Sequence, residues 1–165
     1  MKYIWSPWRM SYIQNHKNES GCVFCQAQAV ADGTENLVLY RGQRAFVILN
    51  RYPYTSGHLM VVPYLHEASL ESLDAETRAE LLELANRIMK MLDREYHAQG
   101  YNVGINIGEA AGAGITDHIH LHVVPRWSGD TNFMSSLGET RVLPETLEDT
   151  YLRMKSAWQQ DDSNS

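Results

Sequence analysis

Three histidines alternate with apolar residues in the segment His-Ile-His-Leu-His-Val-Val at positions 118–124. In a β-strand, side chains two residues apart point to the same face. Such a strand would carry three imidazoles on one face and Ile119, Leu121 and Val123 on the other. Imidazole titrates near neutral pH, binds metal ions and can act as a nucleophile. The segment therefore predicts a strand with one face for chemistry and one for the core.

Two kinds of chemistry fit three imidazoles on one strand. One metal ion held by all three is the less favoured, because the outer Cα atoms would lie about 13 Å apart, whereas zinc binds nitrogen at about 2 Å. The other is a nucleophilic histidine that attacks phosphorus, with neighbouring imidazoles and loop amides holding the phosphate oxygens. The Gly/Ala-rich segment 108–116 directly before the strand suits this second chemistry, since small residues let backbone N–H groups approach a phosphate.

Cys22 and Cys25 form a Cys-x-x-Cys pair and are the only cysteines in the chain. In a reducing compartment this spacing indicates metal binding or redox chemistry rather than a structural disulfide. A redox pair usually opens a helix after a strand of a βαβ unit, and the surrounding sequence has no such pattern. A zinc site, which needs further ligands, and two buried free thiols are the interpretations that stay open.

The composition is that of a single globular domain. The chain has 165 residues, of which 44% are hydrophobic and 21% charged, and its formal net charge is −6. An acidic chain argues against nucleic acid as a partner, although a small anionic ligand can still bind a locally positive pocket. No apolar run is long enough to span a bilayer, and the first residues lack a signal-peptide core. A cytoplasmic location without membrane partners is expected.

The remaining sequence predicts an α+β domain. A long helix is expected at 74–96, because apolar residues recur there at steps of three and four, with Asp74 as N-cap and Gly100 as stop signal. Hairpin-linked strands with this helix between the third and fourth predict a five-stranded antiparallel sheet. The predicted strands are 37–40, 44–50, 58–63, 101–107 and 118–124. The other expected segments are an N-terminal arm at 1–19, a domain at 20–158 that ends in a helix at 144–158, and a disordered tail at 159–165.

The motifs resemble those of the histidine triad (HIT) superfamily. Segment 118–124 matches its His-φ-His-φ-His-φ-φ pattern, in which φ is apolar, and ILNRYPYTSGHLMVVPYLH at 48–66 resembles its second and third strands. INIGEAAGAGITDHIHLHVVPRW followed by SGDTNFM, at 105–134, is similar to a bacterial and archaeal branch that includes diadenosine tetraphosphate phosphorylases. The resemblance implies a homodimer in which two sheets join into ten strands, and chemistry at the α-phosphate of a nucleoside phosphate.

The resemblance also implies roles for single residues. His120, the middle histidine, would be the nucleophile, and His122 would contact the phosphate or the leaving group. Asn50 would hold the ribose hydroxyls and Asn106 the phosphate. His58 is expected to form a local hydrogen bond at the start of its strand rather than to face the nucleotide.

One position departs from the family pattern. Many members carry Gln four residues before the first histidine, where this chain has Gly114. Thr116 or a backbone amide would then have to supply the missing phosphate contact. The departure leaves open whether water, orthophosphate or another acceptor receives the nucleotide.

Zinc-bearing members of the superfamily, and the related galactose-1-phosphate uridylyltransferases, complete a Cys-x-x-Cys site with two histidines. The matching positions here are His66, after the third strand, and His118, the first histidine of the triad. Together with Cys22 and Cys25 they would make a closed tetrahedral set, which is typical of structural zinc and has no open position to activate water. No organic cofactor is implied.

The expected function is a nucleotidyl transferase or hydrolase that forms a covalent His120–nucleotide intermediate on adenosine phosphates. Its best-specified form is a dinucleoside polyphosphate phosphorylase. A dinucleotide hydrolase or nucleoside phosphoramidate hydrolase is the near alternative. A non-catalytic nucleotide-binding or zinc-scaffold protein and a metal-dependent hydrolase are the alternatives from other classes.

Overall fold

The fold is described from a computed structural model over residues 21–130 and 144–163. The expected N-terminal arm and the end of the SGDTNFM motif lie outside these residues. No helix in the described ranges is both long and apolar enough to cross a membrane. In chain order the elements are α2 (Val23–Ala29), β1 (Val38–Arg41), β2 (Ala45–Leu49), β3 (Leu59–Pro63), the 3-10 turn η1 (Leu70–Ser72), α3 (Ala75–Tyr96), β4 (Gly100–Ile105), the 3-10 turn η2 (Glu109–Ala111), β5 (Leu121–Arg126) and α5 (Leu147–Ser163).

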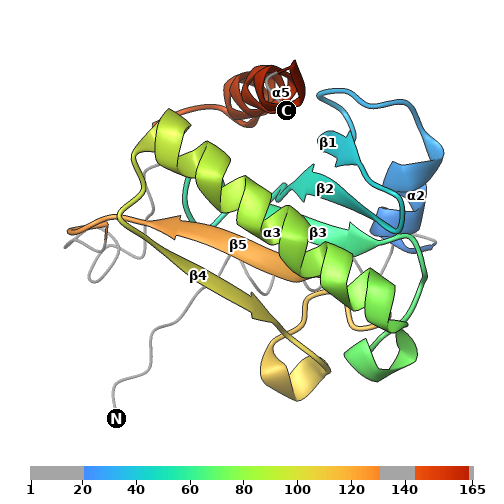
Figure 1. Ribbon diagram of the computed structural model, residues 1–165. Coiled ribbons are helices and arrows are strands. Elements are labelled where there is room, and N and C mark those ends of the chain that lie inside the picture. Colours follow the sequence, from blue (N-terminus) through green and yellow to red (C-terminus); the bar gives the residue numbers. More distant parts are fainter. Residues whose placement is uncertain (1–20, 131–143, 164–165) are drawn as a thin grey trace, which may run out of the picture.

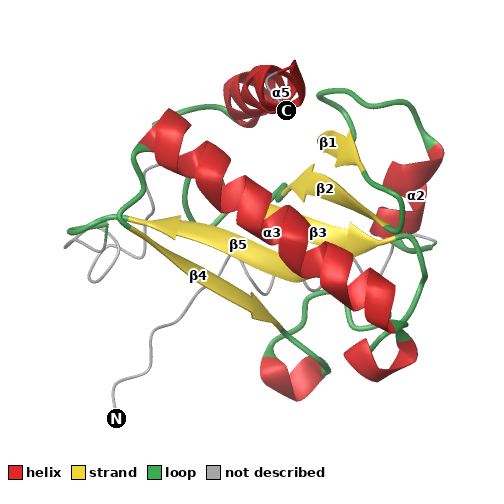
Figure 2. Cartoon of the chain, viewed as in Figure 1, coloured by secondary structure: helices red, strands yellow, loops and turns green. Residues whose placement is uncertain are grey.

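The five strands form one sheet in the order β1-β2-β3-β5-β4, and every neighbouring pair is antiparallel. The two central strands β2 and β3 are apolar and buried along their whole length, whereas β4 lies at an edge and is largely exposed. Helix α3 lies across one face of the sheet, and α5 packs beside it near β1 (Figures 1 and 2). The predicted α+β fold with a five-stranded antiparallel sheet, one long helix and a C-terminal helix is confirmed.

Helix α3 begins and ends for local reasons. The predicted N-cap is confirmed, because Asp74 Oδ1 accepts a hydrogen bond from the backbone N–H of Thr77 at 2.7 Å. The predicted end at Tyr96 is confirmed, but Gly100 is not the residue that stops the helix. His97 ends the helix in a left-handed conformation with φ 48°, and Gly100 already opens β4. The apolar stripe of the helix packs into the core and consists of Leu81, Leu84, Ala85, Ile88, Met91 and Leu92.

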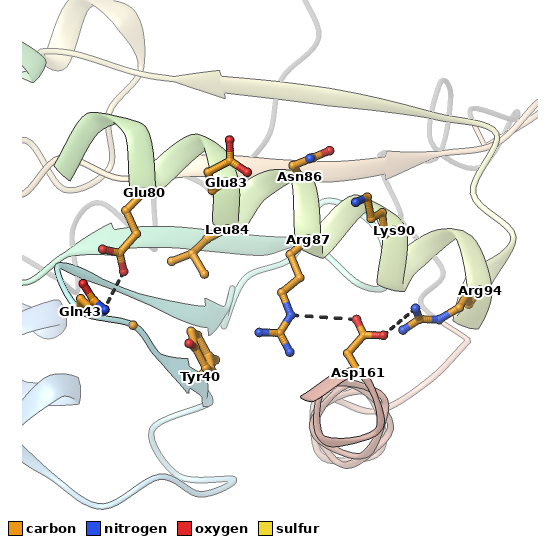
Figure 3. A pocket seen from close by; sticks show the side chains of 11 residues that line it. Tyr40, Gln43, Glu80, Glu83, Leu84, Asn86, Arg87, Lys90, Arg94 and Asp161 are labelled. Carbon is orange, nitrogen blue, oxygen red and sulfur yellow. Dashed lines mark hydrogen bonds and ion pairs between the residues drawn. The ribbon is translucent and has the colours of Figure 1, made fainter. Parts of the chain in front are cut away.

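Helix α5 is longer than predicted, since it runs to Ser163 instead of ending at Trp158. Asp161 forms ion pairs with Arg87 at 4.0 Å and with Arg94 at 2.7 Å, both on α3, as Figure 3 shows. The guanidinium of Arg87 also lies over the Trp158 ring, 4.0 Å from its centroid. The expectation of a disordered tail is therefore wrong up to Ser163, because charged residues there find partners on a neighbouring helix.

The histidine segment is less regular than predicted. Strand β5 begins at Leu121, so the first two histidines precede it. The backbone N–H of Ile119 donates instead to the carbonyl of Glu67 at 2.6 Å, which pairs this part of the chain with the segment that follows β3. The predicted alternation is retained, and the intervening apolar residues, Ile119, Leu121 and Val123, are all buried in the core.

Candidate active site and metal centre

A cavity of about 1470 Å³ brings the predicted substrate residues together. Part of its floor is a row of residues paired directly across three strands, Ile48 on β2, Met60 on β3 and His122 on β5. Helix α2 and the loop before β5 supply further walls. All six residues predicted to act on substrate line this cavity: Asn50, Asn106, Gly114, Thr116, His120 and His122.

The remaining histidine of the triad belongs to a second cluster, two of whose members, Cys22 and His66, also line the cavity. Nδ1 of His118 lies 3.3 Å from Sγ of Cys22 and 3.6 Å from Sγ of Cys25. Nδ1 of His66 lies 3.2 Å from Sγ of Cys25, and the four ligand atoms are all within 4.8 Å of one another. The structure thus places the four predicted metal ligands side by side, although they come from three distant segments.

This donor set fits zinc. Bonds of about 2.0–2.3 Å in a tetrahedron put neighbouring ligand atoms about 3.3–3.8 Å apart. Three of the four sulfur–nitrogen distances are 3.2, 3.3 and 3.6 Å. His118 directs Nε2 at the carbonyl of Pro63, at 2.9 Å, so its Nε2 carries the proton and Nδ1 is left to bind a metal. Burial lowers the pKa of His118, which keeps the imidazole neutral, as a metal ligand must be.

His120 is buried, with 4% of its surface exposed, and its ring is held in one tautomer. Its Nδ1 lies 2.9 Å from the carbonyl oxygen of His118, a partner that only accepts, so Nδ1 donates and Nε2 carries the lone pair. Burial lowers the pKa of His120. The ring of Phe24 packs against it with centroids 5.0 Å apart. A neutral, oriented imidazole with a basic Nε2 is what a nucleophilic histidine requires.

His58, assigned only a local hydrogen bond from sequence, is fully buried and is joined to the triad. Its Nδ1 accepts the backbone N–H of Tyr54 at 3.2 Å, so in the neutral ring the proton sits on Nε2. That Nε2 lies 3.0 Å from Nδ1 of His122 and donates to it, which assigns the His122 proton to Nε2. The Tyr54 ring covers both imidazoles, with centroids 4.7 Å from His58 and 6.2 Å from His122.

The two histidines on the cavity wall therefore have opposite tautomers. His120 presents a lone pair on Nε2, and His122 carries an N–H there. Their ring centroids are 4.8 Å apart. One residue is suited to attack an electrophile, and its neighbour is suited to donate a hydrogen bond to the oxygen beside it.

The other predicted substrate residues differ in how much hydrogen-bonding capacity they retain. Asn50 is engaged within the site, since its Oδ1 accepts the backbone N–H of Tyr52 at 2.9 Å and its Nδ2 lies 3.3 Å from Nδ1 of His58. The hydroxyl of Thr116 donates to Asp117 Oδ1 at 2.9 Å. This bond occupies the proton that a phosphate oxygen would need, so the geometry favours loop amides over Thr116 as phosphate donors.

Comparisons with known proteins identify relatives of this chain. Residues 32–129 match the HIT domain family. An AP-4-A phosphorylase from Mycobacterium tuberculosis is 36% identical in an alignment of 166 positions, which covers 96% of this chain and 85% of that protein. A Zn-bound histidine triad family protein from Mycobacterium smegmatis is 33% identical with a TM-score of 0.70, covering 88% of this chain and 98% of that one.

A hypothetical histidine triad nucleotide-binding protein from Sulfolobus tokodaii has the same fold, with a TM-score of 0.67 and 25% identity, over 87% of this chain and 93% of that one. The matched residues 32–129 contain the cavity strands and all three triad histidines, and they make up more than half of the sequence. The chain belongs to the histidine triad (HIT) family.

Proposed function

We propose that this protein is a nucleotidyl transferase for adenosine phosphates that works as a dinucleoside polyphosphate phosphorylase. The observation that carries the proposal is the state of His120, a buried imidazole that lines the cavity. Its Nδ1 donates to the His118 carbonyl, which leaves the lone pair on Nε2. The similarity to an AP-4-A phosphorylase over 96% of the chain supports the choice of substrate.

The reaction has two displacements at one phosphorus atom. Nε2 of His120 attacks the α-phosphorus of an adenylate group in diadenosine tetraphosphate, forming a P–N bond while the P–O bond to the leaving ATP breaks. An oxygen of orthophosphate then attacks the same phosphorus, the P–N bond breaks, and ADP leaves. The imidazole regains its lone pair, so the enzyme is unchanged after each turnover.

Groups around His120 would stabilise the charge that develops on the phosphoryl oxygens. The Nε2–H of His122 donates beside the nucleophile. In the described chain, the backbone N–H groups of Gly114 and Ile115 donate to no other described residue, and both residues line the cavity. Asn106 lines the same cavity, as does Asn50, which directly follows β2 and would hold the ribose. Preorganised donors of this kind usually make the largest contribution to such catalysis.

Zinc would be held by Cys22, Cys25, His66 and His118. When bound, it supplies a structural cross-link between three segments and has no open coordination position. Because the carbonyl of His118 accepts from His120, fixing His118 also fixes the orientation of the nucleophile.

The choice of acceptor is tested by product analysis. With diadenosine tetraphosphate and orthophosphate, we expect equal amounts of ATP and ADP. A hydrolase would instead release ATP and AMP, whether or not orthophosphate is present. Chromatography of the nucleotides at several phosphate concentrations separates the two cases, and ¹⁸O-labelled phosphate in the ADP would trace the acceptor. No turnover of any adenosine phosphate would contradict the proposed function.

His58→Leu is expected to lower kcat by about 10²-fold, because His122 loses the partner that orients its ring. KM should change less, since His58 is fully buried beneath the cavity wall. The matched control is His97→Asn, an exposed histidine at the end of α3 whose left-handed backbone suits asparagine. Steady-state kinetics of both variants, with circular dichroism to verify folding, check the prediction. Equal kcat values for the two variants would show that the His58–His122 contact has no catalytic role.

We also propose a homodimer formed along β4. Among the described residues, no strand pairs with the outer side of this edge strand, and Val103 is 43% exposed although it is apolar. Pairing two copies of β4 would join the sheets into the ten strands that the family resemblance implies. Sedimentation equilibrium should give twice the mass of the 18.8 kDa chain, and Val103→Lys should shift the mass toward the monomer. A wild-type protein that sediments as a monomer would contradict the proposal.

A further inference from the structure

Arg41, the last residue of β1, lies outside the cavity and hydrogen-bonds to the C-terminal end of helix α2. Its Nη1 donates to the carbonyl of Gln28 at 2.8 Å. Its Nη2 donates to the carbonyls of Val30 at 2.7 Å and Ala27 at 3.3 Å. A planar guanidinium with five N–H donors is suited to satisfy several carbonyls at once, which the single ammonium of lysine does less well.

Helix α2 needs this external support. It has only seven residues and no basic residue in its last turn, and isolated helices of this length are unstable in water. The last four carbonyls of any helix have no partner within the helix itself. Here Arg41 supplies most of the missing donors, and Asn36 adds one more through Nδ2 to Ala27 at 3.1 Å. The position of α2 therefore depends on a side chain from β1.

Helix α2 carries residues of both the metal centre and the candidate active site. Cys22 is its N-cap and Cys25 lies in its first turns, so the helix presents both thiols of the metal centre. Its Phe24 ring packs against the rings of His118 and His120, with centroids 5.4 Å and 5.0 Å apart. A displacement of α2 would move two metal ligands and uncover the nucleophile.

Arg41 is itself held by the C-terminal helix. Its Nε donates to Asp32 Oδ1 at 2.8 Å, and Asp32 Oδ2 accepts from Nζ of Lys155 on α5 at 3.2 Å. Lys155 also donates to the carbonyl of Leu39 in β1 at 2.6 Å. All three charged side chains are about two-thirds or more buried, with 31%, 27% and 27% exposed, so solvent screens them less than a surface pair. A continuous set of polar contacts thus connects α5 to α2.

We propose that Arg41 is a positioning residue for both the metal centre and the nucleophile, and that Asp32 and Lys155 hold it in place. The catalytic part of this proposal rests on the proposed function, whereas the metal-binding part does not. Arg41 touches no reacting atom. It acts through α2, by keeping the two thiols opposite His66 and His118 and the Phe24 ring against His120.

The test compares Arg41→Ala with the matched control Arg44→Ala. Arg44 directly precedes the next strand, β2, and pairs with the exposed Asp74 at 2.9 Å. Within the described residues it makes no polar contact with α2. Competition with a chromophoric chelator measures Zn²⁺ affinity, and hydrogen exchange measures protection of the α2 amides. For Arg41→Ala we expect zinc affinity to fall by about 10–100-fold, α2 protection to be lost, and kcat to fall with it. Arg44→Ala should behave like the wild type.

Graded variants keep the proposal testable if Arg41→Ala does not fold. Arg41→Lys keeps the positive charge but loses the planar set of N–H donors, so it should lower zinc affinity less than Arg41→Ala does. Lys155→Met should also lower zinc affinity, by less than Arg41→Lys. Zinc affinity and α2 exchange in Arg41→Ala equal to those of Arg44→Ala would overturn the proposal. A wild-type protein that binds zinc yet turns over no adenosine phosphate would reject the proposed function only, because the zinc and exchange measurements would still decide the role of Arg41.

Discussion

His120→Ala is expected to lower the turnover of diadenosine tetraphosphate by about 10³–10⁶-fold, the range that loss of a covalent nucleophile produces. The variant retains the cavity and the donors around the phosphate, and it lacks the only group proposed to bond to phosphorus. When the wild type is rapidly mixed with substrate and quenched, mass spectrometry should show an adenylate on the peptide that contains His120. The variant should show none.

Two controls separate chemistry from folding in this experiment. His120→Ala should bind zinc as the wild type does, because its imidazole is not among the four ligand atoms of the metal cluster. His120→Gly should regain some turnover when free imidazole is added, since a small molecule can then occupy the space of the missing ring. A His120→Ala variant with wild-type turnover would reject the covalent mechanism, and binding without any adduct in the wild type would favour the non-catalytic alternative.

Removing the metal is the second change with a large expected effect. The double variant Cys22→Ser, Cys25→Ser should be purified without zinc and should unfold at a lower temperature. If free zinc exceeds its dissociation constant about 1,000-fold, binding stabilises the folded state by about 4 kcal/mol. For a domain of this size that corresponds to a melting temperature roughly 10 °C lower. Metal analysis and calorimetry with and without added zinc check both parts.

The structural role of the metal is distinguished from a catalytic one by the zinc-free wild type. At a temperature where that protein is still folded, turnover should be reduced but not lost, because the metal only holds His118 in place, whereas the nucleophile belongs to His120. Turnover that disappears with the metal while the fold is retained would support the metal-dependent hydrolase instead. A melting temperature that changes neither with added zinc nor with the two serine substitutions would contradict the metal centre.

Local patterns explain which parts of the fold were predictable. Helix α3 carries an apolar stripe of period 3.6 and an N-cap at Asp74, and both signals lie within the segment itself. The end of α5 was not predictable in this way, because the residues after Trp158 are polar and find their partners on α3. Asp162 pairs with Arg87 across 75 positions of sequence. A polar segment is helical or disordered according to contacts that periodicity does not record.

The metal centre shows the same division. A Cys-x-x-Cys spacing indicates ligands that are near in sequence, and the family resemblance supplied His66 and His118. Cys22 and His118 are 96 positions apart, and their 3.3 Å separation exists only because α2 packs against the segment before β5. Phe24, whose ring packs against both His118 and His120, belongs to no recognisable motif and was not anticipated.

Alternate histidines share one side of any extended segment, whatever the fold around it, because residues two apart in such a segment always do. The role of each histidine depends instead on its tertiary contacts. His118 lies against the thiols, His120 donates a hydrogen bond to a carbonyl, and His122 accepts one from His58. A tautomer is set by its hydrogen-bond partner. For His120 that partner is the carbonyl only two residues before it, whereas for His118 and His122 the partners are the Pro63 carbonyl and His58, 55 and 64 positions away. The alignment of β3 with β5 brings these distant partners together, and local spacing does not encode it.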